Sequence, residues 1–209
     1  MTYITRLIMN KERGQTRRLV GDAEALHAAV MKSFSQPAID EMDEKTGRIL
    51  WNLEFNRDPE LYIFSPVPPD LSHLVEQVGR PNDEFCVVSK SYDTVLAGIE
   101  AGAKFRFRVK VNPTFTQNGK KVAHVTDVQA LKWLSKKAAS CGFSIEDADV
   151  KDHGFLRFKK NSGRVTLKWV TAEGVLSITN AEAFVSSVKN GIGRGKAYGL
   201  GMLTVAKIG

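Results

Sequence analysis

The sequence predicts an α+β fold in which two halves share one order of elements, β-α-β-β-α-β. Residues 104–111 alternate strictly between cations and apolar residues, as a half-buried strand does. Residues 22–34 carry apolar side chains at helical spacing. Turn-forming residues divide the other apolar runs into short strands. Two halves of this kind are typical of tandem ferredoxin-like (RRM-like) domains.

In the first half, Asp22 is expected to cap a helix that runs to about residue 34. Its apolar stripe consists of Ala23, Leu26, Val30 and Phe34. A short helix is expected over residues 70–77, after prolines that break the chain. Residues 10–21 and 35–47 are rich in polar and charged side chains and are expected to be loops. Strands are expected at residues 3–9, 48–55, 61–64 and 85–90.

In the second half, Thr126 or Asp127 is expected to cap a helix to about residue 140, and Asn180 one to about residue 189. The remaining apolar runs exceed the four strands of one such half, so an extra strand or hairpin is expected. The expected strands are 104–111, 144–151, 155–159, 165–170, 175–178 and 200–205. We place the domain boundary near Asp93, which gives domains at residues 1–93 and 94–209.

The charge is divided unequally between the halves. The 209 residues carry a net charge of +7. Residues 1–93 hold 11 Lys and Arg against 15 Asp and Glu, a net charge of −4, so residues 94–209 carry +11. A strongly basic half predicts a polyanionic partner, most often nucleic acid. The alternative is a soluble basic surface with no such partner.

Cysteine content and hydropathy indicate the compartment. Cys86 and Cys141 are the only cysteines, and they form no CxxC motif. No run approaches the ~18 apolar residues of a membrane span, and the N-terminus lacks the apolar region of a signal peptide. We therefore expect a cytoplasmic protein that does not contact a membrane.

Two strand regions offer cations to phosphate groups. Alternation places Lys104, Arg106, Arg108 and Lys110 on one face of a strand, with neighbours roughly 6.6–6.8 Å apart. The alternative is an edge strand that its charges protect from pairing. The turn after residue 159 carries Lys159, Lys160 and Arg164 and could enter a groove of duplex RNA, or it could be an ordinary solvated turn.

A glycine-rich segment at residues 191–201 holds five glycines with Arg194 and Lys196. It matches neither a Walker A loop nor a GxGxxG motif before a helix. Around Gly193 and Gly195, free backbone N–H groups can approach phosphate oxygens, and the two cations add charge. The alternative is a tight turn before the last strand.

His27 differs from the other histidines, His73, His124 and His153, which lie in expected loops or at element edges without partners at ligand spacing. On its helix, His27 borders the buried stripe, where it can face a cleft. The alternative, which the helix position alone favours, is a half-buried histidine with a structural role. The basic half has no carboxylate cluster suited to Mg²⁺. We therefore expect no metal and no cofactor: RNA can be cut by its own 2′-hydroxyl, with a histidine to move protons.

Motifs in order along nearly the whole chain resemble the CasE-type CRISPR repeat endoribonucleases of type I-E Cascade. Each is weak alone, and the last is the most specific. They are YITRL at residue 3, LH at 26 with VM at 30 and Phe34, ILWNL at 49, PDLSHL at 69, FRFR at 105, NPT at 112, GKKV at 119, WL at 133, KKA at 136 and the glycine-rich segment to Leu203.

The resemblance implies tandem ferredoxin-like domains and metal-independent cleavage at the 3′ base of the repeat hairpin in pre-crRNA. It implies a 2′,3′-cyclic phosphate or 3′-phosphate, with the enzyme staying on the crRNA hairpin beside other Cascade subunits. His27 matches the family's catalytic histidine. Lys32 matches a position that assists the reaction in some members, although an unbroken helix would place it roughly 140° from His27.

The sequence departs from the family at Glu24, where the family often has a tyrosine. An ionised glutamate repels phosphate, or it orients a protonated His27. This keeps open a second hypothesis, a Cascade subunit that binds the hairpin and cuts it slowly or not at all. A third is an unrelated ferredoxin-like nucleic-acid binder.

Overall fold

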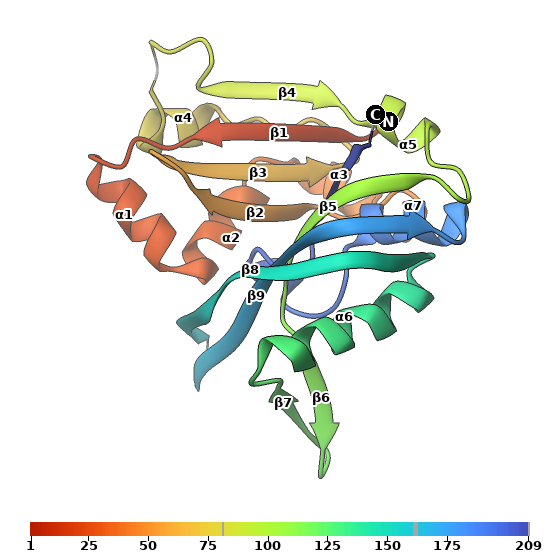
Figure 1. Ribbon diagram of the computed structural model, residues 1–209. Coiled ribbons are helices and arrows are strands. Elements are labelled where there is room, and N and C mark those ends of the chain that lie inside the picture. The colour runs from red at the N-terminus through yellow and green to blue at the C-terminus, as the bar shows by residue number, and fades with distance from the viewer. Residues whose placement is uncertain (81, 161–162, 209) are drawn as a thin grey trace.

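The computed structural model describes residues 1–80, 82–160 and 163–208, which form two four-stranded antiparallel sheets and a separate hairpin (Figure 1). The first sheet has the order β2-β3-β1-β4 and the second β10-β5-β9-β8. The first sheet consists of β1 (Tyr3–Ile8), β2 (Leu50–Phe55), β3 (Pro59–Ser65) and β4 (Val87–Ser91). The second consists of β5 (Lys104–Val111), β8 (Phe143–Lys160), β9 (Gly163–Ile178) and β10 (Leu203–Lys207). The central strands are β1 and β3 in the first sheet and β5 and β9 in the second, which are the first and third sheet strands of each half along the chain. This order confirms the predicted ferredoxin-like fold.

Helices of the first half cover one face of the first sheet. They are α1 (Gly14–Gly21), α2 (Ala23–Met31), α3 (Gln36–Asp40) and α4 (Ser72–Val78), and a short α5 (Asp93–Ala97) follows β4. Leu26 and Val30 of α2 pack with Leu74 of α4 in one apolar core. The α2 helix begins as predicted, because an Asp22 carboxylate oxygen accepts hydrogen bonds from the N–H groups of Glu24 and Ala25.

Two expected loops contain helices instead. Residues 10–21 include α1, which buries Thr16 and Leu19 and contacts α2 and α4. Only two residues of α1 are buried, so residues 10–21 show no apolar helical pattern among their cations and glycines. Residues 35–47 include α3, which has Pro37 in its first turn, where proline lacks only an N–H group that has no helical partner. The loop predictions were wrong at these two places.

The helices of the second half begin as predicted. In α6 (Asp127–Ser140), Thr126 and Gln129 form a capping box, and the Asn180 side chain caps α7 (Ala181–Asn190). Their buried faces pack on Phe105, Phe107 and the other apolar residues of β5. A hairpin outside both sheets, β6 (Thr114–Gln117) with β7 (Lys120–Ala123), occupies residues for which no strand was predicted.

The four short strands expected between residues 144 and 178 are two long ones. β8 and β9 pair along their whole lengths, with register shifts near residues 146 and 151, and form a ribbon that extends beyond the sheet (Figure 1). Two glycines lie in the gaps between the predicted strands, and each marks a close approach of neighbouring groups within a continuous strand. A Cβ on Gly154 would lie 2.8 Å from the Trp169 ring, and one on Gly174 would overlap the Asp147 backbone.

The two halves share an apolar junction. Leu50 and Phe64, paired across β2 and β3 on the face away from α2 and α4, belong to the same cluster as Leu203 of β10. Tyr92 packs edge-on against Phe64, with ring centroids 5.3 Å apart. The boundary near Asp93 falls between β4 and β5 and stays a prediction. In the described residues, no helix has the length and hydropathy to cross a membrane.

Tyr92→Phe is expected to lower the free energy of unfolding by about 1–3 kcal/mol. The buried Tyr92 hydroxyl donates to the Val205 carbonyl (3.1 Å) and accepts from the Val205 N–H (3.3 Å), at the edge strand β10. Urea unfolding measures the loss. Tyr3→Phe is the control, because its hydroxyl meets Met1 Sδ at the surface; equal losses in both variants would contradict this account.

Candidate active site

His27 lies where the two halves meet. Its half-buried ring meets the ring of Tyr198 edge to face, with centroids 6.4 Å apart and an angle of 64° between the planes. Tyr198 ends the short helix η1 (Lys196–Tyr198), and Phe158 of β8 packs against the same tyrosine at 4.3 Å. A histidine from the first half therefore meets an aromatic side chain of the second, which a further aromatic ring supports. Sequence reasoning did not single out Tyr198, although it lies inside the glycine-rich segment.

A second histidine supports the helix that carries His27. His73 of α4 donates a hydrogen bond from Nε2 to the Ala29 carbonyl of α2, at 3.1 Å. Sequence spacing gave His73 no partner, because the two residues are 44 positions apart. The hydrogen bond and the apolar contacts of Leu26 and Val30 fix the position of α2.

Glu24 and Lys32 flank His27 along the chain. Glu24 is half-buried in the first turn of α2, and its Oε2 is buried with no hydrogen-bond partner in the described residues. Lys32 follows the last residue of α2, is exposed, and keeps helical dihedral angles (φ −63°, ψ −16°). The end of α2 therefore does not turn Lys32 toward His27.

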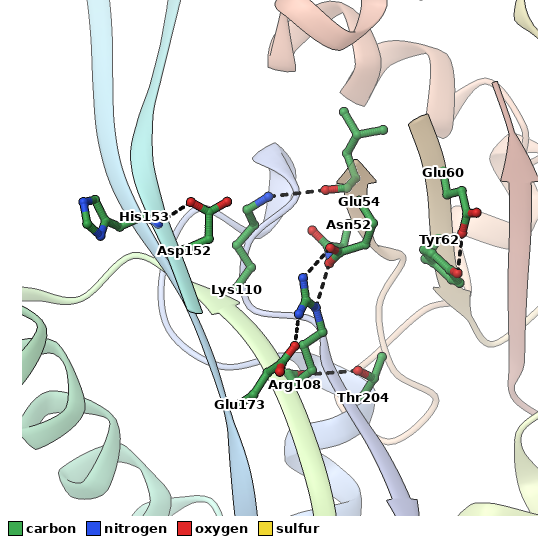
Figure 2. A network of polar contacts seen from close by, with 11 residues as sticks. Asn52, Glu54, Glu60, Tyr62, Arg108, Lys110, Asp152, His153, Glu173 and Thr204 are labelled. Carbon is green, nitrogen blue, oxygen red and sulfur yellow. Dashed lines mark hydrogen bonds and ion pairs between the residues drawn. The ribbon is translucent and has the colours of Figure 1, made fainter. Parts of the chain in front are cut away.

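The four cations of β5 share one face, as predicted, but they meet different surroundings. Lys104 lies 3.6 Å from Glu146, and Arg106 is exposed in an open groove. Arg108 forms ion pairs with Glu54 of β2 and with Glu173 of β9 (Figure 2). Its Nε and Nη2 donate to the two Glu54 oxygens at 3.1 and 2.5 Å. Arg108 therefore joins the two halves.

Lys110 also faces the first half. Its Nζ donates to the Leu53 carbonyl at 3.3 Å (Figure 2) and lies 4.2 Å from the centre of the Trp169 ring. Burial lowers the pKa of the Lys110 ammonium, an effect that the Glu54 and Asp152 carboxylates partly offset. The strand pattern predicted the face of Lys110 but not the sheet edge that covers it.

The glycines of residues 191–201 are required by the chain's own packing. All five have positive φ. A Cβ on Gly199 would lie 2.5 Å from the Trp51 ring of β2, and one on Gly193 would lie 2.9 Å from Trp133. The segment forms a tight turn before β10, which was the alternative interpretation of its sequence. The turn brings Tyr198 against the first half. The predicted phosphate contacts of Gly193 and Gly195 stay predictions.

The two cations of this segment differ in exposure. Arg194 is exposed, and its backbone forms a bridge with Asn112. Lys196 is half-buried, and burial lowers its pKa, assisted by the nearby charges of Arg48 and Lys137. Several cations therefore gather beside the glycine-rich segment.

The end of the β8–β9 ribbon carries the other predicted cations. Lys159 pairs with Arg164 across the ribbon, and both are exposed. The Lys160 backbone ends β8 opposite Gly163, but its side chain and residues 161–162 lie outside the described part of the chain.

A cavity of about 220 Å³ opens beside the edge strand β2, and we name it the β2-edge cavity. Parts of α2, β2, β9 and η1 enclose it, through Leu26, Trp51, Trp169 and Tyr198. Lys110 also lines it. Because Tyr198 contacts both the cavity and His27, the two are neighbours.

Known proteins resemble this chain over nearly its full length. The sequence profile of a family described as "CRISPR associated protein" matches residues 2–207. CRISPR-associated endoribonuclease Cse3 of Thermus thermophilus is 26% identical over 224 residues, covering 98% of this chain and 99% of the relative. CRISPR system Cascade subunit CasE of Escherichia coli is 26% identical over 123 residues, covering 53% of this chain and 61% of the relative.

A solved structure of Thermus thermophilus Cse3, bound to an RNA representing a pre-cleavage complex, has a similar fold. The TM-score is 0.85 at 25% sequence identity, over 98% of each chain. The resemblance to CasE-type endoribonucleases that the motifs predict is confirmed. This chain belongs to the CRISPR associated protein family.

Proposed function

We propose that this chain is an endoribonuclease that cuts CRISPR repeat RNA at the 3′ base of its hairpin and then stays on the crRNA within Cascade. The observation that carries the proposal is the placement of His27 between the acidic first half and the basic second half. A full-length relative named an endoribonuclease, a relative named a Cascade subunit and an RNA-bound solved relative support it.

Attack by the RNA's own 2′-hydroxyl needs no outside reagent. The 2′-oxygen bonds to the adjacent phosphorus while the bond from phosphorus to the 5′-oxygen breaks. One proton leaves the 2′-oxygen and one reaches the 5′-oxygen, which yields a 2′,3′-cyclic phosphate and a 5′-hydroxyl. Histidine titrates near physiological pH, so it can move one of these protons efficiently. We assign one transfer to His27.

Tyr198 is proposed as a positioning residue for His27. Its ring edge contact limits rotation of the imidazole, and Phe158, which lies in the same half as Tyr198, holds the tyrosine in place. Because general acid–base catalysis depends on a positioned proton carrier, the glycine-rich segment contributes to the reaction through Tyr198.

Phosphate binding is proposed for the cations of the second half that solvent can reach. Arg106, Lys159, Arg164 and Arg194 are exposed, and Lys196 is half-buried. Lys104 is exposed beside Glu146. Arg108 and Lys110 instead hold the halves together through contacts with β2, which we propose as their role.

His27→Ala is expected to lower the single-turnover cleavage rate of a repeat hairpin by about 10²–10⁴-fold. The assay is run with excess EDTA, with His153→Gln as control, because His153 lies in an exposed part of β8. A substrate with a 2′-deoxy nucleotide before the cleaved phosphate should stay intact. Cleavage of the deoxy substrate, or loss of all cleavage in EDTA, would contradict 2′-hydroxyl attack without metal.

A sulfur substitution separates the two proton transfers. A 5′-thiolate leaves without protonation, so a 5′-thio substrate should restore cleavage by His27→Ala if His27 protonates the leaving oxygen. Continued loss of cleavage would assign His27 to the 2′-oxygen. Both substrates give the same upstream fragment, which ends in a 2′,3′-cyclic phosphate, so the gel mobility of that fragment measures both reactions alike.

Arg194→Gln is expected to weaken hairpin binding about uniformly across repeat sequences and to reduce the slope of log K against log[salt] by about 1. Lys90→Gln is the matched control, because Lys90 is exposed on β4 in the first half. A salt dependence near zero for the wild type would contradict the polyanion argument itself.

A second function, hairpin binding with slow or absent cleavage, rests on Glu24. Its half-buried carboxylate occupies the position where the resemblance expects a tyrosine. Tight binding without cleavage by the wild type, with cleavage gained in Glu24→Tyr, would favour it. Rapid cleavage by the wild type would exclude it.

A further inference from the structure

We propose that the β2-edge cavity binds the base of the first unpaired nucleotide downstream of the cleaved bond. The inference rests on the proposed function and deepens it, because it names a substrate contact that the reaction itself does not require. The downstream nucleotide lies outside the hairpin, so its base can enter a pocket without breaking a base pair.

Aromatic side chains dominate the walls and the mouth of the cavity. Trp51, Trp169 and Tyr198 line its interior, and Phe55 and Phe155 line it from β2 and β8. Those two phenylalanines are 62% and 55% exposed. Large apolar side chains gathered around one opening indicate a ligand with an apolar face. Unpaired RNA bases are bound in this way, by stacking on aromatic rings.

Polar groups in the same cavity suit the edge of a base. Asn52 Oδ1 and Trp51 Nε1 are buried and have no hydrogen-bond partner in the described residues. Trp51 is only 4% exposed, and a buried N–H group without a protein partner favours a ligand acceptor in the cavity. Lys110 adds an ammonium group, held at the open edge of β2 by the Leu53 carbonyl. The lining residues thus carry one acceptor and two donors, the two kinds of group that a base carries along its edge.

The cavity lies beside the proposed reaction site. Tyr198 lines the cavity and also meets the His27 ring, and Leu26 lines it one residue before His27. A base held there leaves its sugar and phosphate next to His27. The Arg157 guanidinium carbon lies 5.5 Å from the centre of the Phe155 ring, so a cation stands beside one wall of the cavity.

The position of the bound base predicts a difference in affinity between the uncleaved repeat and the product hairpin. Cleavage separates the downstream nucleotide from the hairpin that is retained. The cavity therefore contributes to binding of the uncleaved repeat but not to binding of the product hairpin. A cavity that serves only packing, or one that receives a protein segment, would not distinguish the two RNAs.

The experiment compares dissociation constants for two RNAs and three proteins. One RNA is a repeat with a 2′-deoxy nucleotide that blocks cleavage, and the other is the product hairpin. Phe155→Ala is expected to weaken binding of the blocked repeat by about 5- to 140-fold, and to change product binding by less than about twofold. Phe85→Ala is the control, because Phe85 is 64% exposed but lies outside the cavity.

Two further measurements identify the base. An abasic downstream nucleotide should weaken wild-type binding by a similar factor, and Phe155→Ala should then add little. 2-Aminopurine at that nucleotide should lose fluorescence on binding the wild type and keep it with Phe155→Ala. Independent, additive losses would overturn the proposal, as would equal weakening of both RNAs or no weakening at all. A change in Cascade assembly without a change in RNA affinity would overturn it in favour of a protein segment.

The wild-type control separates this inference from the proposed function. If the wild type fails to bind or cut an all-RNA repeat, the proposed function fails and the cavity assignment fails with it. If the wild type cuts normally and Phe155→Ala binds both RNAs like the wild type, only the cavity assignment fails.

Discussion

Arg108 on β5 is held between Glu54 of the first sheet and Glu173 of the second, and the geometry of the site depends on this junction. The Arg108 side chain keeps 39% of its surface exposed, so the ion pairs contribute only modest stability. The apolar contacts of Leu50 and Phe64 contribute the larger part through burial. The ion pairs of Arg108 fix the relative orientation of the two sheets, because a guanidinium binds a carboxylate in few geometries. Together these contacts set the distance between β2 and the second half.

The glycine-rich segment follows from the same constraint. Between α7 and β10 the chain runs against the edge strand β2. It passes the Trp51 ring at Gly199, where a side chain would overlap the ring. The Gly201 N–H donates to the Lys110 carbonyl at 2.6 Å, which ties the segment to β5. A substitution at Gly199 would thus move Tyr198 and, through it, the surroundings of His27. The segment therefore shapes the surroundings of His27 by packing, independently of the phosphate contacts proposed for it.

Patterns along the chain predicted what depends on local chemistry. Alternation in residues 104–111 predicted β5 and the face of its cations, and Asp22 predicted the start of α2. What the cations face could not be read from the pattern, because Glu54 is 54 residues away from Arg108. The same limit hid the hydrogen bond from His73 to Ala29 and the contact of Tyr198 with His27. The gap predicted between residues 151 and 155 was wrong, because β8 continues through Gly154, where the Trp169 ring lies against the glycine.

Neither half contains the proposed site alone, and the charge is divided between the same two halves. The first half supplies His27 and the edge of β2, and the second supplies Tyr198, Phe158 and most exposed cations. Acidic residues of the first half can pair with cations of the second, as Glu54 does with Arg108. These pairs lie at the junction, apart from the exposed cations that we propose bind RNA phosphates. An RNA that crosses the junction contacts both halves at once. Its binding therefore favours the same arrangement that Arg108 and Lys110 maintain in the free protein, because a ligand stabilises the conformation to which it binds more tightly.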